Sequence, residues 1–136
     1  MNKLRLRIAR IALALGVAAL AWACNAPFIP IPPPGRTASF SSQLVSDGQG
    51  GQKTVWIAYG AAYPPASFAH IFVFDTDRSA GVIAQAAADG SYTSPPMDGV
   101  TNDRVEISYE TPSFEVSTSV CFQLVDGPSA PLCPSP

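Results

Sequence analysis

This 136-residue chain contains almost no histidine, and it lacks two common nucleophile motifs of catalytic sites. His70 is the only histidine and lies within an apolar run, so a metal site built from several histidines is excluded. The chain also has no Gly-x-Ser-x-Gly and no Ser-x-x-Lys nucleophile motif. We therefore expect a structural role for His70, no catalytic residues, no metal and no cofactor, and a protein that is not an enzyme.

Positive charge is scarce once the first 23 residues are set aside. Residues 24–136 contain four basic residues against ten acidic ones, which gives a net charge of −6. A domain of this sign has no electrostatic footprint for nucleic acid or for anionic lipid headgroups. The acidic residues are scattered along the chain, so their main predicted effect is solubility.

Calcium-binding patterns are incomplete. Asp75 and Asp77 begin like an EF-hand loop, but the motif then needs glycine where Ala80 stands and glutamate where Ala86 stands. Without the turn-forming glycine and the bidentate glutamate, the two aspartates are expected to be solvated turn residues.

No apolar run is long enough to span a bilayer. The longest one, residues 11–23, has 13 residues, whereas a spanning helix needs about 20. Four basic residues precede the run, and small residues end it. This arrangement is typical of a secretory signal peptide, so residues 1–23 are expected to be removed rather than retained as a membrane helix.

The end of that run, Ala-Trp-Ala-Cys at residues 21–24, permits two interpretations. The small residues Ala21 and Ala23 suit ordinary signal peptidase. A cysteine directly after the cut also resembles the lipobox of bacterial lipoproteins, although Ala21 stands where leucine is preferred and Trp22 is bulky. The resemblance implies that Cys24 carries lipid and holds the protein in the bacterial cell envelope. In a Gram-negative organism this would be the outer membrane, with the domain in the periplasm or at the cell surface.

The number of cysteines favours the lipoprotein interpretation. Three cysteines in an exported chain leave one without a partner. If Cys24 is lipidated, Cys121 and Cys133 remain as one pair, and we expect them to form a disulfide in an oxidising compartment.

Residues 24–36 contain five prolines, a composition typical of a stiff, extended spacer. We interpret them as a tether between the membrane and the domain. The alternative, a proline-rich ligand for SH3-type domains, is disfavoured for an exported chain.

Residues 37–136 have the pattern of an all-β domain. Turn dipeptides such as Asp-Gly and Pro-Pro recur, and β-prone runs lie between them. We predict seven strands, near 38–45, 53–59, 68–75, 81–87, 91–94, 104–110 and 116–124. Seven short strands with turns every 8–12 residues predict an antiparallel β-sandwich.

Individual strands have distinct faces. In 104–110, Val105, Ile107 and Tyr109 alternate with polar residues, which indicates a half-buried strand. Along 116–124, alternate apolar residues are predicted to share the inner face, with Cys121 on the other. The run 68–75 is apolar on both faces and is predicted to be central.

Two segments resemble bacterial Ig-like modules: Ala-Asp-Gly-Ser-Tyr at 88–92, and Asn-Asp-Arg-Val-Glu-Ile at 102–107. The resemblance implies an Ig-like sandwich. Asn102 and the turn at 111–114 replace positions where that family usually has glycine. A transthyretin-like sandwich fits the strand pattern nearly as well, and the alanine-rich stretch 80–88 could instead begin a helix.

Aromatic residues suggest one binding surface. Trp56 and Tyr59, together with Tyr63 and Tyr92, could form a platform for sugar or for a protein. The alternative, which we favour, is that Trp56 fills the core.

These observations predict a non-catalytic envelope lipoprotein that acts as a structural or protein-interaction module. Its expected partners are the membrane, through lipid on Cys24, and envelope proteins. A carbohydrate- or peptidoglycan-binding module, which would bind cell-wall glycan, is the second hypothesis. An envelope hydrolase is the third, disfavoured by the missing nucleophile motifs.

Overall fold

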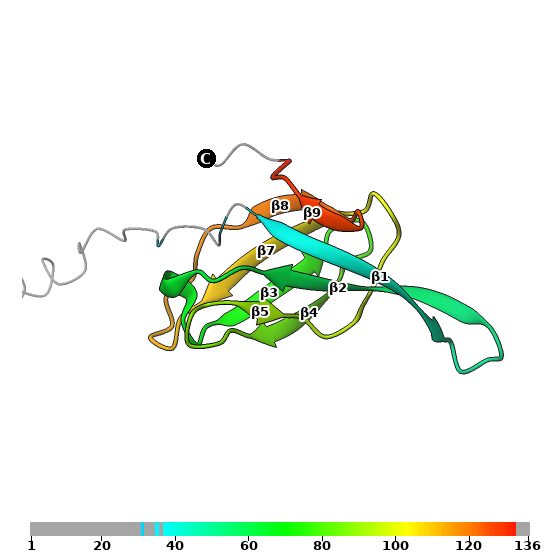
Figure 1. Ribbon diagram of the computed structural model, residues 1–136, viewed down its shortest axis with the longest axis horizontal. Helices are drawn as coiled ribbons and strands as arrows, with labels where there is room; N and C mark the ends of the chain where they lie inside the picture. Colours follow the sequence, from blue (N-terminus) through cyan, green and yellow to red (C-terminus); the bar gives the residue numbers. More distant parts are fainter. Residues whose placement is uncertain (1–30, 32–34, 36, 133–136) are drawn as a thin grey trace, which may run out of the picture.

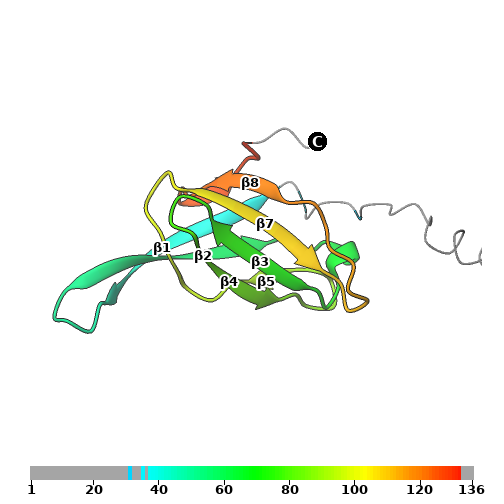
Figure 2. The same ribbon diagram turned by 180° about the vertical axis from the view of Figure 1, so that it is seen from behind.

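Two antiparallel β-sheets stack face to face and enclose the apolar side chains between them (Figures 1 and 2). The structure, a computed structural model, describes Ile31, Gly35 and residues 37–132. Within this part of the chain the only helical element is one 3-10 turn, η1 (Pro64–Ala66). The predicted all-β sandwich is therefore confirmed. The predicted signal peptide, Cys24, most of the tether and Cys133 lie outside the described residues.

The first sheet has the order β5-β2-β1-β9, and β6 also pairs with β2. Its strands are β1 (Ala38–Ser46), β2 (Gln52–Gly60), β5 (Tyr92–Thr93), β6 (Met97–Asp98) and β9 (Gly127–Ser129). The second sheet has the order β4-β3-β7-β8. Its strands are β3 (His70–Asp75), β4 (Ala80–Gln85), β7 (Arg104–Glu110) and β8 (Val120–Gln123). The hairpin between β1 and β2 extends past the end of the second sheet in both views (Figures 1 and 2).

The core follows the alternation of the strands. Val105, Ile107 and Tyr109 of β7 are fully buried, as their spacing predicted. Phe40 of the first sheet meets Phe122 of the second edge to face, with ring centroids 6.1 Å apart. The placement of residues 68–75 at the centre of a sheet is also confirmed, because β3 lies between β4 and β7.

The prediction for residues 116–124 was only partly right. The strand begins at Val120, and Val116 is 48% exposed. Ser117 is buried instead, where its Oγ accepts the N–H of Tyr109 at 2.9 Å. Residues 116–119 lie outside β8, so the predicted inner face holds only from Val120 onward.

The alanine-rich stretch after the β3–β4 turn forms strand β4 and not a helix. The Asp-Gly turn at residues 89–90 does not join β4 and β5 as a hairpin, because these strands belong to different sheets and β5 pairs with β2. The turn itself is present and carries the chain across the sandwich. Gly90 has φ +80°, and a Cβ at this position would overlap the carbonyl oxygen of Tyr63, so both the backbone angle and the space require glycine.

Two turns in which glycine is usual among Ig-like modules keep the backbone conformation that glycine favours. Asn102 has φ +77° and Phe114 has φ +65°. Asparagine tolerates this left-handed region, whereas it is strained for phenylalanine.

Candidate functional site

The outer face of the second sheet carries an apolar strip made of Phe72, Phe74 and Ile83. Phe72 and Ile83 are cross-strand partners on β3 and β4. Phe74 is 44% exposed and Ile83 57% exposed, and a shallow hollow of about 300 Å³ runs along them. Gly81 stands opposite Phe74, whose Cδ2 lies 3.0 Å from where a Cβ of residue 81 would be. The missing side chain lets the phenylalanine ring lie over the edge strand.

Strand β4 is an open edge of this sheet. It pairs with β3 along one side, and no backbone bond to its other side is found among the described residues. The strand has neither a charged residue nor a proline, the devices that commonly protect an exposed edge. At the opposite edge of the sheet, by contrast, the Leu132 N–H donates to the Cys121 carbonyl at 2.9 Å, so the chain itself covers part of β8.

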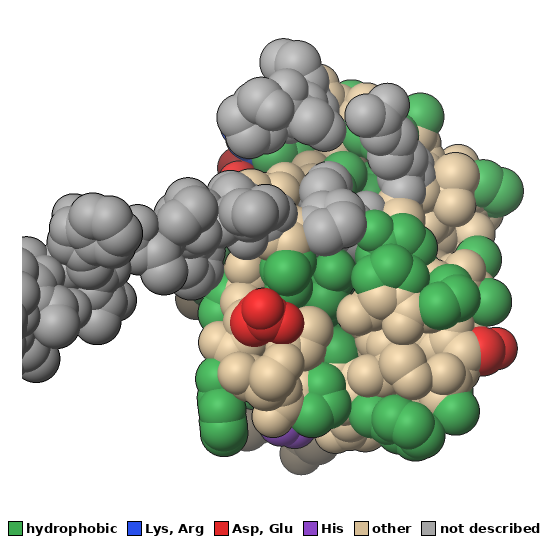
Figure 3. All heavy atoms as spheres, turned by 90° about the vertical axis from the view of Figure 1, so that its left-hand side faces the viewer, with side chains coloured by type: hydrophobic (Ala, Val, Ile, Leu, Met, Phe, Trp, Pro, Cys, Tyr) green, Lys and Arg blue, Asp and Glu red, His purple; other side chains and the backbone are tan. Residues whose placement is uncertain are grey.

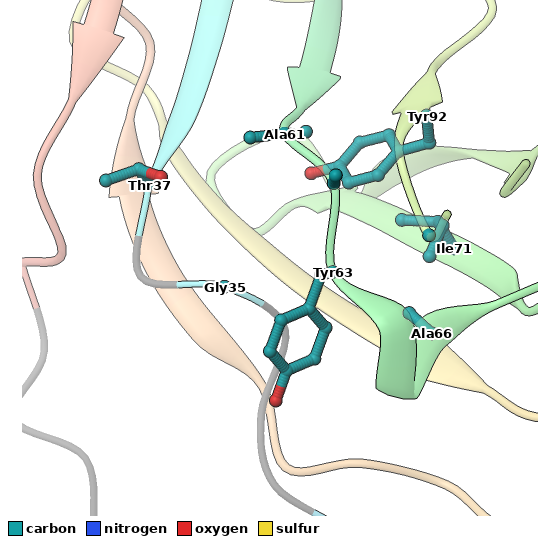
Figure 4. Close-up of a pocket in the computed structure, with 10 residues that line it drawn as sticks. Gly35, Thr37, Ala61, Tyr63, Ala66, Ile71 and Tyr92 are labelled. Carbon is teal, nitrogen blue, oxygen red and sulfur yellow. The ribbon is translucent and has the colours of Figure 1, made fainter.

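Three tyrosines gather at the end of the sandwich that carries η1. The Tyr92 ring lies against Gly60 so closely that a Cβ there would overlap it. Tyr92 and Tyr63 line a small pocket of about 60 Å³, and the Tyr63 ring extends beside Gly35 (Figure 4). A neighbouring hollow of about 500 Å³ lies between Tyr59 and Tyr92. We call these two adjoining hollows the tyrosine cleft.

The polar lining of the larger hollow of the tyrosine cleft comes from Gln85, Ser91 and Thr93. Burial raises the pKa of the Tyr92 hydroxyl above its ordinary value, so this group stays a neutral hydrogen-bond donor and acceptor at physiological pH. On the end of the molecule shown in Figure 3, apolar side chains lie among polar ones and acidic side chains are isolated.

Trp56 and Tyr59 do not form the predicted aromatic platform. They are three residues apart on β2, and successive side chains of a strand point to opposite faces. Trp56 is therefore buried in the core, with 1% of its surface exposed, while Tyr59 is 36% exposed and faces the tyrosine cleft. The interpretation of Trp56 as a core residue is confirmed.

A pair of acidic side chains lies beneath the β3–β4 turn. Asp75 is fully buried rather than solvated, which corrects the prediction for this residue. Its Oδ1 accepts the N–H groups of Asp77 at 2.9 Å and Arg78 at 3.0 Å, whereas its Oδ2 has no hydrogen-bond partner. Burial raises the pKa of Asp75, and the neighbouring carboxyl of Asp103 raises it further.

The pKa of Asp103 is shifted in the opposite direction from that of Asp75. Burial acts to raise its pKa, but the Arg78 guanidinium and the Val100 N–H outweigh burial, so the pKa of Asp103 is lowered. Arg78 Nε lies 2.6 Å and Val100 N 2.8 Å from Asp103 Oδ2. The pair therefore consists of an ionised Asp103 held by cationic and N–H donors and an Asp75 that favours its proton.

Cys121 lies on the outer face of its strand, as predicted, and is 5% exposed. Its Sγ lies 3.3 Å from Arg104 Nη2 and 3.6 Å from Glu106 Oε1. Because Cys133 lies outside the described residues, the disulfide between Cys121 and Cys133 stays a prediction. His70 is exposed at the start of β3.

In the described ranges, no group of three or more histidine, cysteine or acidic side chains is arranged to hold a metal ion. No helix long and apolar enough to cross a membrane occurs in the same part of the chain. Comparison of the sequence and the structure with protein-family models, curated proteins and solved structures gave no significant match.

The sequence did not identify the apolar strip or the open edge. The alternation of residues in 68–75 could have revealed the outward Phe72 and Phe74, because only one face of a sandwich sheet meets the core. Nothing in residues 80–85 marks them as an edge strand.

Proposed function

We propose that this chain is a non-catalytic lipoprotein of the bacterial cell envelope, and that its β-sandwich is a protein-interaction module. The observation that supports an interaction role is the apolar strip beside the open edge of β4. Exposed aromatic and aliphatic side chains next to unpaired backbone groups suit the addition of a strand from a partner. Isolated exposed apolar residues would carry no such implication, but here the exposed Phe74 and Ile83 and the half-buried Phe72 adjoin one unprotected edge.

The order of the strands supports an Ig-like sandwich rather than a transthyretin-like one. In constant-type Ig domains the first, second, fourth and fifth strands share one sheet and the third, sixth and seventh share the other, and variable-type domains add further strands to the second sheet. Here β1, β2 and the short pair β5 and β6 lie in one sheet, while β3, β7 and β8 lie in the other. In this arrangement β4 is an additional strand on the edge of the second sheet.

The lipid anchor rests on the signal-peptide pattern and the number of cysteines. Two described residues of the tether lie against the sandwich: Ile31 packs against the core and forms a bridge with Ser117, and a Cβ at Gly35 would lie 3.9 Å from the Tyr63 ring. Intact mass spectrometry of the mature protein should give a chain that begins at Cys24 and carries acyl groups. An unmodified mass for that chain would contradict the lipoprotein proposal.

The interaction role can be tested by site-specific photo-crosslinking in intact envelopes. A photoreactive residue at position 83 is expected to give covalent protein adducts. The same residue at Leu44, which is 68% exposed on the β1–β2 hairpin, is the matched control and should give few. Equal adduct yields at both positions, or none at position 83, would count against the apolar strip as the interaction surface.

The tyrosine cleft supports a second candidate, a carbohydrate- or peptidoglycan-binding module. Its larger hollow combines an aromatic ring on each side with amide and hydroxyl groups, the combination that suits a sugar. Calorimetry with soluble peptidoglycan fragments tests this candidate. Binding that is lost in Tyr59→Ala, while the melting temperature is kept, would favour it over the protein-interaction role.

A further inference from the structure

We propose that β4 pairs in antiparallel fashion with β4 of a second copy of this chain, about a two-fold axis at Ile83. The two four-stranded sheets would then continue as one sheet of eight strands. This inference deepens the proposed function and rests on it, because it identifies the partner of the apolar strip as the same surface of another molecule.

The hydrogen-bonding pattern determines which backbone groups are available. The Ala86 N–H donates to the Ala69 carbonyl, and the Thr76 N–H donates to the Arg104 carbonyl, each at 2.9 Å. Antiparallel strands alternate between residues that bond to one neighbour and residues that face the other way. The register of β3 with β4 extends this alternation along β4. The N–H and C=O groups of Gly81, Ile83 and Gln85 therefore point to the open side.

These three residues define a self-complementary register. With Ile83 opposite Ile83 of the second copy, Gly81 lies opposite Gln85 at both ends. Each of the three pairs exchanges two backbone bonds, so the seam gains about six hydrogen bonds. The side chains of these residues share the outer face with the apolar strip, so the two exposed Ile83 side chains meet at the centre.

The uncharged and unprotected edge of β4 favours a second copy as the occupant. Each mature chain carries a net charge of −6, which opposes the association of two copies over most of their surface. Strand β4 has no charge, so two copies can approach there without placing like charges opposite each other. Pairing also covers an edge strand that lacks the usual protection against uncontrolled strand addition.

A seam of one strand per molecule is small by the standard of stable dimers. Lipid anchors at Cys24 would hold both copies on the same membrane and raise their effective concentration. The proposal therefore predicts dimers on the membrane more readily than in dilute solution.

Cysteine cross-linking of the full-length, exported protein in envelope membranes tests this pairing. Across the two-fold axis, the Cα atoms of the two residues 83 should lie about 5.5 Å apart, within the roughly 4.4–6.8 Å range of a disulfide. Ile83→Cys is therefore expected to give a disulfide-linked dimer under mild oxidation. Gln85→Cys is the matched control, since it lies on the same face of the same strand but roughly 14 Å from its own copy in this register.

A dimer yield for Ile83→Cys at least tenfold above that for Gln85→Cys would support the two-fold pairing. Equal yields, or no dimer from either variant, would overturn it. In the second case, adducts between position 83 and a different protein would still support the interaction role, whereas the absence of any adduct would remove both. In the otherwise unchanged chain, Ile83→Lys should abolish the dimers that a cross-linker unreactive toward lysine captures. Its melting temperature should remain near that of the parent.

Discussion

The buried carboxyl of Asp75 gives the sharpest test of this structure, because it predicts that a conservative loss of charge stabilises the fold. In Asp75→Asn the side-chain oxygen can still accept the N–H groups of Asp77 and Arg78. The amide nitrogen would replace Oδ2, the oxygen that has no partner, and could donate to the neighbouring carboxylate of Asp103. The substitution therefore keeps the turn and removes an unfavourable buried charge.

The expected magnitude follows from the groups involved. A buried polar group without a partner costs about 1–3 kcal/mol, and a hydrogen bond to a charged acceptor contributes about 1.5–3 kcal/mol. Since the asparagine must also adopt one fixed orientation, we expect a net gain of about 1 kcal/mol at pH 7. For a domain of this size, that gain raises the melting temperature by roughly 4–8 °C.

The gain should depend on pH with a definite sign. Because burial, and then Asp103, raise the pKa of Asp75 in the folded chain, the ionised carboxylate destabilises the fold at any pH above that raised pKa. The destabilisation disappears as the pH falls to the ordinary aspartate pKa and below, where Asp75 is protonated in both the folded and the unfolded chain. The advantage of Asp75→Asn over the parent should therefore be greatest near neutral pH and should vanish in acid.

Urea unfolding of the parent and Asp75→Asn at a series of pH values provides the measurement. The difference between the two proteins cancels other groups that titrate equally in both. Asp75→Ala is the control, since it removes the acceptor of two backbone N–H groups and should lose about 2 kcal/mol or more. An Asn variant less stable than the parent at pH 7, or a difference that does not change with pH, would refute this account of the acidic pair.

Three other predictions concern packing and the covalent structure. Gly60→Ala should lower the free energy of unfolding by about 1–3 kcal/mol, because a methyl group would overlap the Tyr92 ring; urea unfolding measures the loss, and unchanged stability would mean that the ring can move. Trp56→Ala should cost about 3–5 kcal/mol in the same assay, with a smaller loss for Trp56→Phe, because the indole is 1% exposed; equal losses would show that ring volume is not what the core requires. Peptide mapping of the exported protein without reductant should find Cys121 joined to Cys133, and reduction should lower the stability by about 3 kcal/mol; two reduced thiols after export would contradict the bridge.

The strands with clear alternation could be predicted from the sequence. Residues 104–110 became β7 with the predicted bounds, and their inner face is the most completely buried part of the sandwich. Short strands were less visible. Strands β6 and β9 have two and three residues, too few for a period to appear, and they exist because longer neighbours offer them a pairing edge.

The candidate interaction surface could not be predicted in the same way, because the edge position of a strand is a property of the topology. Residues 80–85 would read the same in the middle of a sheet as they do at its edge. The edge arises because the chain crosses to the other sheet after Ala86, through the turn in which Gly90 fits beneath Tyr63. Gly90, which lies outside β4, therefore helps to decide that the outward backbone N–H and C=O groups of Ile83 have no neighbouring strand from the described part of this chain.

Asp75 shows the same limit at the level of one side chain. Its neighbours, Thr-Asp-Arg-Ser at 76–79, have the composition of a solvated turn, and the turn is indeed present. The carboxyl is buried because residue 99 is a glycine: a Cβ there would lie 3.5 Å from Asp75 Oδ2 and 3.0 Å from Trp56 Cδ1. The loop that follows β6 therefore closes over two side chains from different sheets, and each leaves one polar atom, Asp75 Oδ2 and Trp56 Nε1, without a partner. Because both side chains lie beneath the same glycine, Gly99→Ala, which has no space for its methyl group beside Leu124 Cδ1 at 2.7 Å, should destabilise the parent and Asp75→Asn by different amounts. Equal losses in the two backgrounds would show that the loop and the acidic pair are independent.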